Sequence, residues 1–260
     1  MIKFFKDIKK YFNYIFYSAK TTLKSEVANS YLNWLWWILE PLCFMVIYAL
    51  VFTFFFKGNI KHLSPFIFIG ITFWDFFSRM LKNSVKLVRS NKTIVSKVYI
   101  PKYALVLEKL AVNMFKTSIS FAIIIALMIV TKVPFTFHVL WSVLLIASLL
   151  IFVFGLSTIF MHFGVYVDDL SNITEIFLRL MFYMTGVFYN LGDKAIGNLG
   201  FVLVHFNPMA FYINAFRDSL LYGKMPELLW LLGWTAVGVL LSVVGITLVQ
   251  KNENNYVKVI

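Results

Sequence analysis

Long apolar stretches separated by short polar segments run through most of the chain. Six of these stretches are long and apolar enough to be read as membrane helices, each needing about 20 residues. They cover residues 34–56, 65–81, 103–131, 139–167, 173–191 and 228–250. The pattern predicts an all-α polytopic membrane protein with six transmembrane helices, built as a single transmembrane domain over residues 1–260.

The first 30 residues alternate apolar and basic positions at helical spacing. A helix of this kind lies in the membrane interface, with its lysines near anionic lipid headgroups. We therefore expect residues 1–30 to form an interfacial amphipathic helix that anchors the chain. A role in gating or in contact with a partner is the alternative. The apolar positions are Phe4, Phe5, Ile8, Tyr11, Phe12, Ile15 and Phe16.

Residues 192–227 contain two apolar pieces that are each too short to cross a membrane. The pieces are residues 201–206 and 210–221, and Asn207 and Pro208 separate them. Two short pieces broken in this way predict an outer re-entrant helical hairpin before the last span. Its irregular backbone would have to be covered by protein or face water. A folded outer loop resting on lipid headgroups is the alternative.

Residues 82–102 carry six Lys and Arg and no Asp or Glu. A lysine or arginine in hydrocarbon costs roughly 2.5–3.5 kcal/mol on insertion scales, so this segment must lie at a membrane surface. With the N-terminus inside, the inner segments hold fourteen Lys and Arg and the outer segments hold six. Cytoplasmic loops are enriched in these residues. The charge count therefore predicts that both termini, and the basic segment, are cytoplasmic.

Composition supports the membrane assignment. The 260 residues are 60% hydrophobic and 14% charged, whereas soluble domains are roughly 45–50% apolar and about 25% charged. The net charge of +12 lies between the spans rather than on one polar domain. This distribution does not favour nucleic-acid binding.

The chain lacks the usual signatures of catalysis. It has no G-x-x-x-x-G-K-[ST] loop to hold a nucleotide phosphate, and its four histidines have no metal-ligand spacing. We expect no catalytic residue, no metal and no cofactor in this chain.

A few charged and aromatic residues inside the spans are candidate functional groups. Asp75 and Arg79 are four residues apart on one helix face and are predicted to pair with each other. Glu40 is expected near the inner interface, and Lys116 is expected to extend towards it. Aromatic side chains stack on sugars, so a substrate path is one interpretation of four further residues, with ordinary packing or lipid contact as the other. These are Tyr48, Phe52, Phe177 and Tyr183.

Several short motifs, in this order and spacing, resemble the membrane subunit of type-2 ABC exporters for cell-surface polysaccharides, which include O-antigen, teichoic-acid and capsular-type glycans. The similarity covers nearly the whole chain. The motifs are Ser30-Tyr31-Leu32, Leu35-Trp36 and Pro41-Leu42 at the first span, Gly70-Ile71-Thr72-Phe73-Trp74 with Phe76-Phe77 in the second, Val98-Tyr99-Ile100-Pro101-Lys102 after the basic segment, and Asn207-Pro208 with Phe216-Arg217 near the hairpin.

The resemblance implies a permease in the bacterial cytoplasmic membrane. It would work as a homodimer with two ATP-binding-cassette subunits that bind ATP and Mg, and would export a glycan linked to a polyprenyl diphosphate. Residues 82–102 would form a cytoplasmic coupling helix between the second and third spans, and residues 192–227 an outer gate. For ATPase coupling we expect Val88, Arg89, Lys92, Ile94, Val95 and Tyr99. For the gate we expect Asn207, Pro208 and Arg217.

The chain departs from the family pattern at two places. Asp168-Asp169 stands where the family often has Arg-Asp, and Thr185-Gly186 stands where it often has Ser-Pro. Glycine loosens a helix, so a kink is still expected there. A permease of the same architecture for drugs or small lipids, and an ion-coupled transporter or membrane enzyme, are the rival interpretations.

Overall fold

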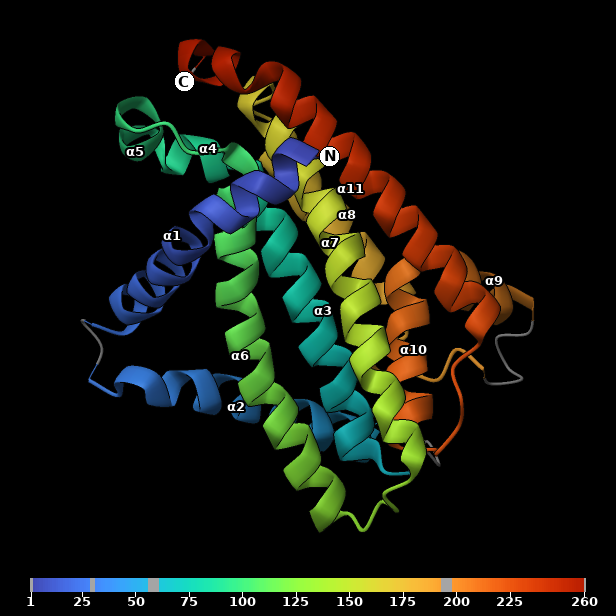
Figure 1. Cartoon of the computed structure of the whole chain (residues 1–260). Coiled ribbons are helices and arrows are strands. Elements are labelled where there is room, and N and C mark those ends of the chain that lie inside the picture. The colour runs from blue at the N-terminus through green and yellow to red at the C-terminus, as the bar shows by residue number, and fades with distance from the viewer. Residues whose placement is uncertain (1, 29–30, 56–60, 193–197, 260) are drawn as a thin grey trace.

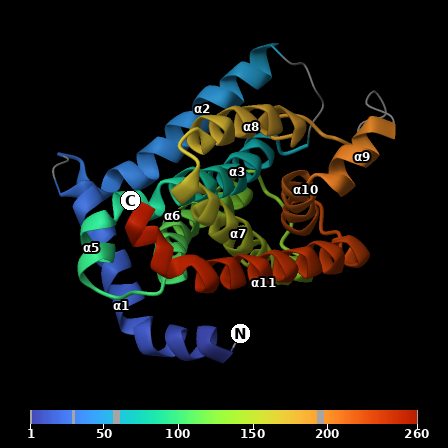
Figure 2. The same cartoon turned by 90° about the horizontal axis from the view of Figure 1, so that it is seen from above.

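A computed structural model describes residues 2–28, 31–55, 61–192 and 198–259. All regular structure in these ranges is helical, and the arrangement is shown in Figures 1 and 2. The elements are α1 (Ile2–Val27), η1 (Asn33–Leu35), α2 (Trp36–Phe55), α3 (Leu63–Val85), α4 (Leu87–Ser90), α5 (Lys92–Lys97), α6 (Lys102–Val130), η2 (Phe137–Leu140), α7 (Trp141–Tyr166), α8 (Leu170–Met184), α9 (Asn198–Phe206), α10 (Pro208–Leu220) and α11 (Leu228–Val259). The predicted all-α class is confirmed.

Three of the described helical segments are long and apolar enough to cross a membrane. They are Lys102–Val130, Phe137–Tyr166 and Leu228–Tyr256. The 29 residues of α6 extend about 44 Å, which exceeds the hydrocarbon core of about 30 Å. These helices make the chain an integral membrane protein, and α6 is long enough to project beyond the bilayer.

Helix α3 forms the centre of the bundle. Seventeen of its 23 residues are buried, and it packs against α6, α7, α8 and α10. A helix that is apolar on nearly all sides is typical of a protein interior. Its polar residues gather on one side towards α2, where Asp75 and Arg79 remain partly exposed. The predicted second span, residues 65–81, lies within α3.

Helices α7 and α11 pack closely along their length through glycines. An added Cβ at Gly155 would lie 2.5 Å from the Ser242 backbone nitrogen, and one at Gly238 would lie 2.9 Å from the Phe152 Cα. Small residues of this kind allow two membrane helices to approach backbone to backbone. Dispersion contacts along this seam hold α11 against the bundle.

Helix α2 lies crosswise to α3 and α6, as both views show (Figures 1 and 2). It contacts both of these helices. The predicted first span, residues 34–56, is therefore helical but does not run alongside the other predicted spans. The six-span arrangement stays a prediction.

The predicted fifth span, residues 173–191, is wrong at its C-terminal end. Helix α8 ends at Met184, and Gly186 has a φ of +65°. This left-handed conformation favours glycine and stops the helix. The expected kink at Gly186 is thus a complete break, after which the chain turns towards α9.

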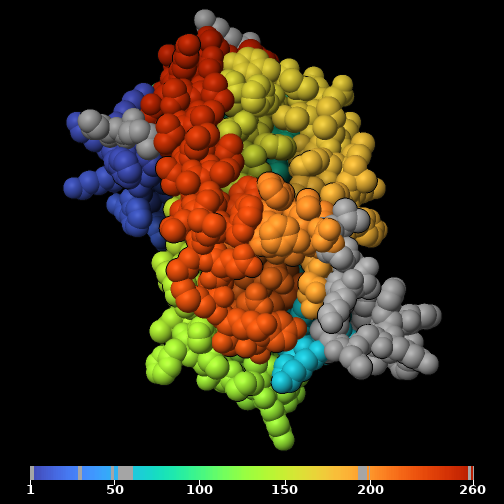
Figure 3. Space-filling model, turned by 90° about the vertical axis from the view of Figure 1, so that its right-hand side faces the viewer, coloured from blue at the N-terminus to red at the C-terminus, as the bar shows by residue number. Residues whose placement is uncertain are grey.

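The predicted hairpin contains two helices, as expected. Asn207 separates α9 from α10, and its side-chain oxygen accepts hydrogen bonds from the backbone nitrogens of Met209 and Ala210. Pro208 begins α10, where its missing N–H removes no helical bond. Figure 3 shows α9 at the surface between α11 and α8, whereas α10 packs inside against α3 and α7. Placement of this pair in the outer leaflet stays a prediction.

Both ends of the described chain lie at one end of the bundle, together with α4 and α5 (Figure 1). Helix α11 continues nine residues past the predicted end of the last span at residue 250. Its last turns are held by buried contacts: Tyr256 is fully buried, and the Glu253 carboxylate accepts hydrogen bonds from Lys3 and Tyr99 at 3.2 and 2.8 Å. The hydrogen bond to Glu253 raises the pKa of Lys3.

Replacement of Gly238 by alanine should destabilise the protein by about 1–3 kcal/mol, because the new Cβ would overlap the α7 backbone. Gly233→Ala on the same helix is the matched control, since nothing lies within 4 Å of its added Cβ. The control should be neutral or slightly stabilising, because alanine favours helix. Thermal unfolding of both variants in detergent micelles measures the difference. Equal effects would show that the seam tolerates a wider spacing.

Candidate functional site

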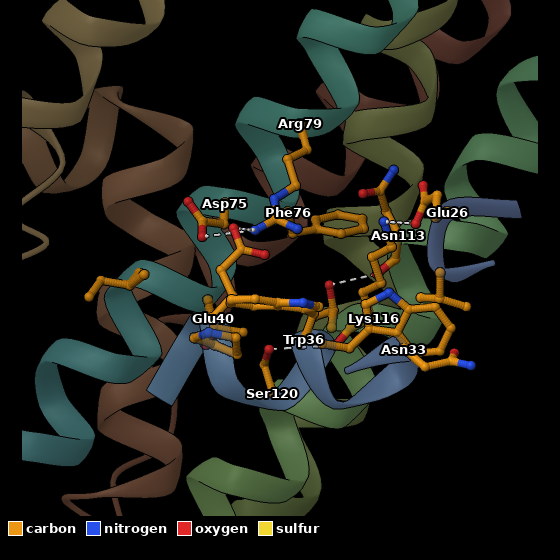
Figure 4. A pocket seen from close by; sticks show the side chains of 16 residues that line it. Glu26, Asn33, Trp36, Glu40, Asp75, Phe76, Arg79, Asn113, Lys116 and Ser120 are labelled. Carbon is orange, nitrogen blue, oxygen red and sulfur yellow. Dashed lines mark hydrogen bonds and ion pairs between the residues drawn. The ribbon is translucent and has the colours of Figure 1, made fainter. Parts of the chain in front are cut away.

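A polar cavity of about 250 Å³ lies where α1, α2, α3 and α6 meet (Figure 4). Helix α3 contributes charged side chains, α6 contributes amide and hydroxyl groups, and α2 contributes two indole rings. The lining residues are Glu26, Val27, Asn33, Trp36, Trp37, Glu40, Pro41, Ile71, Thr72, Asp75, Phe76, Arg79, Asn113, Lys116, Thr117 and Ser120. The cavity therefore combines polar groups with aromatic faces.

Arg79 bridges two carboxylates in this cavity. Its Nη2 atom lies 3.5 Å from the Asp75 carboxylate and 3.5 Å from the Glu40 carboxylate, and Figure 4 shows the three side chains converging. The predicted pair of Asp75 and Arg79 is confirmed. The ion pair between Glu40 and Arg79 was not predicted. A signal for it existed, because Glu40 is the one acidic residue in the apolar stretch 34–56 and so needed a cation nearby.

The end of α1 closes the other side of the cavity. The Glu26 carboxylate pairs with Lys116 at 2.5 Å, and the Thr22 hydroxyl donates a hydrogen bond to buried Glu108 at 2.8 Å. Lys116 was expected to extend towards the interface, and it is held by α1, the helix predicted to lie there. These two contacts tie the amphipathic helix to α6.

The coupling candidates divide into buried and exposed residues. Val88 and Val95 are 1% and 4% exposed, because α4 and α5 fold back onto α6, α7 and α11. Their predicted role in docking is wrong for this structure, since they pack within the chain. Ile94 and Tyr99 are 44% and 53% exposed, and Lys92 is also exposed. Docking by these three residues stays a prediction.

Arg89, another coupling candidate, is bound within the chain. It pairs with the Asp168 carboxylate, and its Nη2 donates a hydrogen bond to the Val165 carbonyl at 2.8 Å. Asp168 stands where the family often has an arginine. Here it pairs with Arg89 of the coupling segment, so α4 is linked directly to the turn after α7.

Arg217, predicted as a gate residue, is buried in the centre of the protein. It is 3% exposed, and it donates hydrogen bonds to three carbonyls: Phe66 at 3.1 Å, Gly186 at 2.8 Å and Val187 at 2.7 Å. Its guanidinium lies 3.4 Å from the centre of the Phe66 ring. Arg217 thus fastens α10 to α3 and to the chain after α8, and Asn207 and Pro208 shape the α9–α10 junction.

Two of the four aromatic candidates for a substrate path have side chains that the structure describes, and the substrate path itself stays a prediction. Phe177 and Tyr183 lie on α8 and are 46% and 71% exposed, on a face that also exposes Ile173, Ile176 and Leu180. The side chains of Tyr48 and Phe52 lie outside the described residues. The indole rings of Trp36 and Trp37, which line the polar cavity, were not predicted as substrate contacts.

This geometry defines a helical membrane protein with a polar cavity between its helices, which is the general form of a transport component. Comparison with known proteins makes this specific. The profile of the ABC-2 type transporter family matches residues 14–221. The chain belongs to the ABC-2 type transporter family.

Relatives in this family align over nearly the whole chain. The O-antigen export system permease protein RfbA of Klebsiella pneumoniae is 26% identical over 240 residues, covering 92% of this chain and 91% of the relative. The protein of the same name from Myxococcus xanthus is 24% identical over 245 residues, covering 93% of each. The alignments include the cavity, the coupling segment and the α9–α10 pair.

Replacement of Arg79 by glutamine should lower thermal stability, because it leaves Asp75 and Glu40 facing each other without a cation. Arg179→Gln on α8 is the matched control. It breaks an ion pair of the same spacing whose Arg side chain is 74% exposed, and it should change little. Thermal unfolding in detergent measures both variants. An equal loss of thermal stability in both variants would mean that the ion pairs of Arg79 contribute no more to stability than a surface ion pair.

Proposed function

We propose that the chain is the permease subunit of an ATP-driven exporter of cell-surface polysaccharide. The observation that carries this proposal is the alignment with two O-antigen export permeases over more than 90% of each chain. A fragment shared by many transporters would not align over this length. We therefore take the substrate class of these relatives as the hypothesis for this protein.

The energy for export comes from a separate subunit. The chain has no phosphate-binding loop, and its family match supports partnership with an ABC ATPase. Two such ATPases, each binding ATP and Mg, dock below a homodimer of this chain. The protein lies in the bacterial cytoplasmic membrane with six spans and both termini inside, consistent with the excess of Lys and Arg in the inner segments.

The exposed side of α5 is the docking surface for the ATPase. Lys92 and Ile94 are exposed there, and Tyr99 is exposed just after it, at the end of the bundle that also holds both termini (Figure 1). Force on α5 passes through α4, where Arg89 pairs with Asp168 at the end of α7. A push from the ATPase therefore moves α7, and with it α11, which packs along the glycine seam.

The substrate is a glycan on a polyprenyl diphosphate. The apolar face of α8, with Phe177 and Tyr183 exposed, pairs with the second copy and lines the path between the two subunits. The α9–α10 hairpin forms the outer gate. The polar cavity beside α2, with its carboxylates and indole rings, offers acceptors for sugar hydroxyls and faces on which sugars stack.

Deletion of the chain in its native host should abolish the surface glycan and leave carrier-linked glycan inside the cell. Restored export should require both this chain and a co-purifying ATPase with an intact phosphate-loop lysine. Export of a labelled drug without any change in surface glycan would favour the drug-permease alternative. ATP-independent transport by the purified chain in proteoliposomes would contradict the proposal.

Replacement of exposed Ile94 by glutamate should weaken co-purification of the ATPase by about tenfold or more, because a charge would enter an apolar contact. Val259→Glu is the matched control: Val259 is 48% exposed, close to the 44% of Ile94, and lies at the same end of the bundle on α11. The ratio of ATPase to permease in the pull-down is the readout. Equal retention by both variants would remove α5 from the docking surface.

A further inference from the structure

A second cavity, of about 360 Å³, lies at the cytoplasmic end of the seam between α3 and α6. The end of α1 and the start of α4 complete it. Its lining residues are Glu26, Lys82, Asn83, Lys86, Leu87, Ser90, Lys109, Val112, Asn113 and Lys116. Four lysines, from α3, the junction between α3 and α4, and α6, therefore face one space, with one carboxylate among the lining residues. This basic cavity is distinct from the polar cavity, whose charges nearly balance.

The charges of the basic cavity are only partly neutralised within the described part of the chain. Lys116 pairs with Glu26 at 2.5 Å, and Lys109 lies 3.5 Å from Glu108. Glu108 also accepts the hydrogen bond from Thr22. No described carboxylate lies within 4.0 Å of Lys82 or Lys86. Two of the four lysines, Lys82 and Lys86, therefore have no carboxylate paired with them.

The two unneutralised lysines repel each other. Lys82 lies in the last turn of α3 and Lys86 is the residue that follows its end, and both line the same cavity. The carboxylate of α8 that their charges reach, Glu175, is already paired with Arg179 at 2.8 Å. An anion in the cavity would relieve this repulsion, and the side-chain amide of Asn83 lines the same space.

The same seam continues into an apolar cavity. The basic cavity shares Glu26, Asn113 and Lys116 with the polar cavity, and the polar cavity shares Phe76 and Thr117 with an apolar cavity of about 120 Å³. The apolar cavity is lined by Phe73, Phe76, Met114, Thr117, Ser118, Phe121, Ile146, Leu149 and Leu150. From Lys109 to Phe121 the helix rises about 18 Å. A headgroup site and a hydrocarbon site thus lie along one seam.

We propose that the α3–α6 seam binds a membrane lipid with a phosphate headgroup, the phosphate lying among Lys82, Lys86, Lys109 and Lys116. Basic pockets between membrane helices on the cytoplasmic side suit such headgroups. The lipid is either an anionic phospholipid or a polyprenyl diphosphate. The second source rests on the proposed export function, whereas the first does not.

Native mass spectrometry of the purified full-length chain tests this proposal. The probes are phosphatidylglycerol, polyprenyl diphosphate and zwitterionic phosphatidylcholine. Replacement of both Lys82 and Lys86 by glutamine should weaken binding of at least one anionic probe by about tenfold to thirtyfold. Phosphatidylcholine binding should not change. The matched control is Lys97→Gln with Lys251→Gln, which removes the same charge from exposed positions outside the cavity.

Each outcome is informative. Loss confined to phosphatidylglycerol identifies a phospholipid, and loss confined to polyprenyl diphosphate identifies the export carrier. Glu26→Gln removes the one carboxylate in the lining and should strengthen anion binding. This second variant tests the proposal even if the double lysine variant folds poorly. Unchanged binding in both the lysine and Glu26 variants, relative to the control, would overturn the proposal. Because no ATPase is present, this result is independent of whether export itself is demonstrated.

Discussion

The arrangement of this bundle depends on one buried guanidinium. Arg217 donates hydrogen bonds to carbonyls of α3 and of the segment after α8, and it lies over the Phe66 ring. A buried cation without a carboxylate is costly unless its donors are satisfied. Two of the three accepting carbonyls, those of Gly186 and Val187, lie beyond the end of α8, and the third belongs to Phe66 of α3. The interruption of α8 therefore supplies two of the acceptors that satisfy the buried guanidinium of Arg217.

This constraint also fixes the place of the α9–α10 pair. Phe216, next to Arg217, stacks on Phe73 of α3 with ring centres 3.6 Å apart. Tyr212, one turn earlier, lies 2.7 Å from the Ser148 hydroxyl of α7. Helix α10 is therefore fastened to both central helices, whereas α9 lies at the surface. A gate built from this pair would move at α9 and at the Asn207 junction, with α10 as its fixed support.

Much of the fold followed from the sequence because hydrophobic length and helical spacing are local properties. Helix α3, the amphipathic α1 and the two hairpin helices were predictable in this way, and so was the pairing of Asp75 with Arg79. Contacts between distant segments were not. Nothing local indicates that Arg89 meets Asp168, that Glu40 joins Arg79, or that Val88 and Val95 pack inwards. The end of α8 was predicted too late, because an apolar run continues past Gly186 and the sequence indicated only a kink at that glycine.

A double-mutant cycle between Gly70 and Arg217 tests this account most directly. An added Cβ at Gly70 would lie 2.7 Å from the Arg217 Nη2 atom and 3.0 Å from the Val187 carbonyl oxygen. The free energy of unfolding in detergent would be measured for Gly70→Ala, Arg217→Met and the double variant. We predict that Gly70→Ala costs less when Arg217 is methionine, with a coupling energy of about 1 kcal/mol or more. Additive effects, within about 0.3 kcal/mol, would contradict the claim that Arg217 holds these segments together.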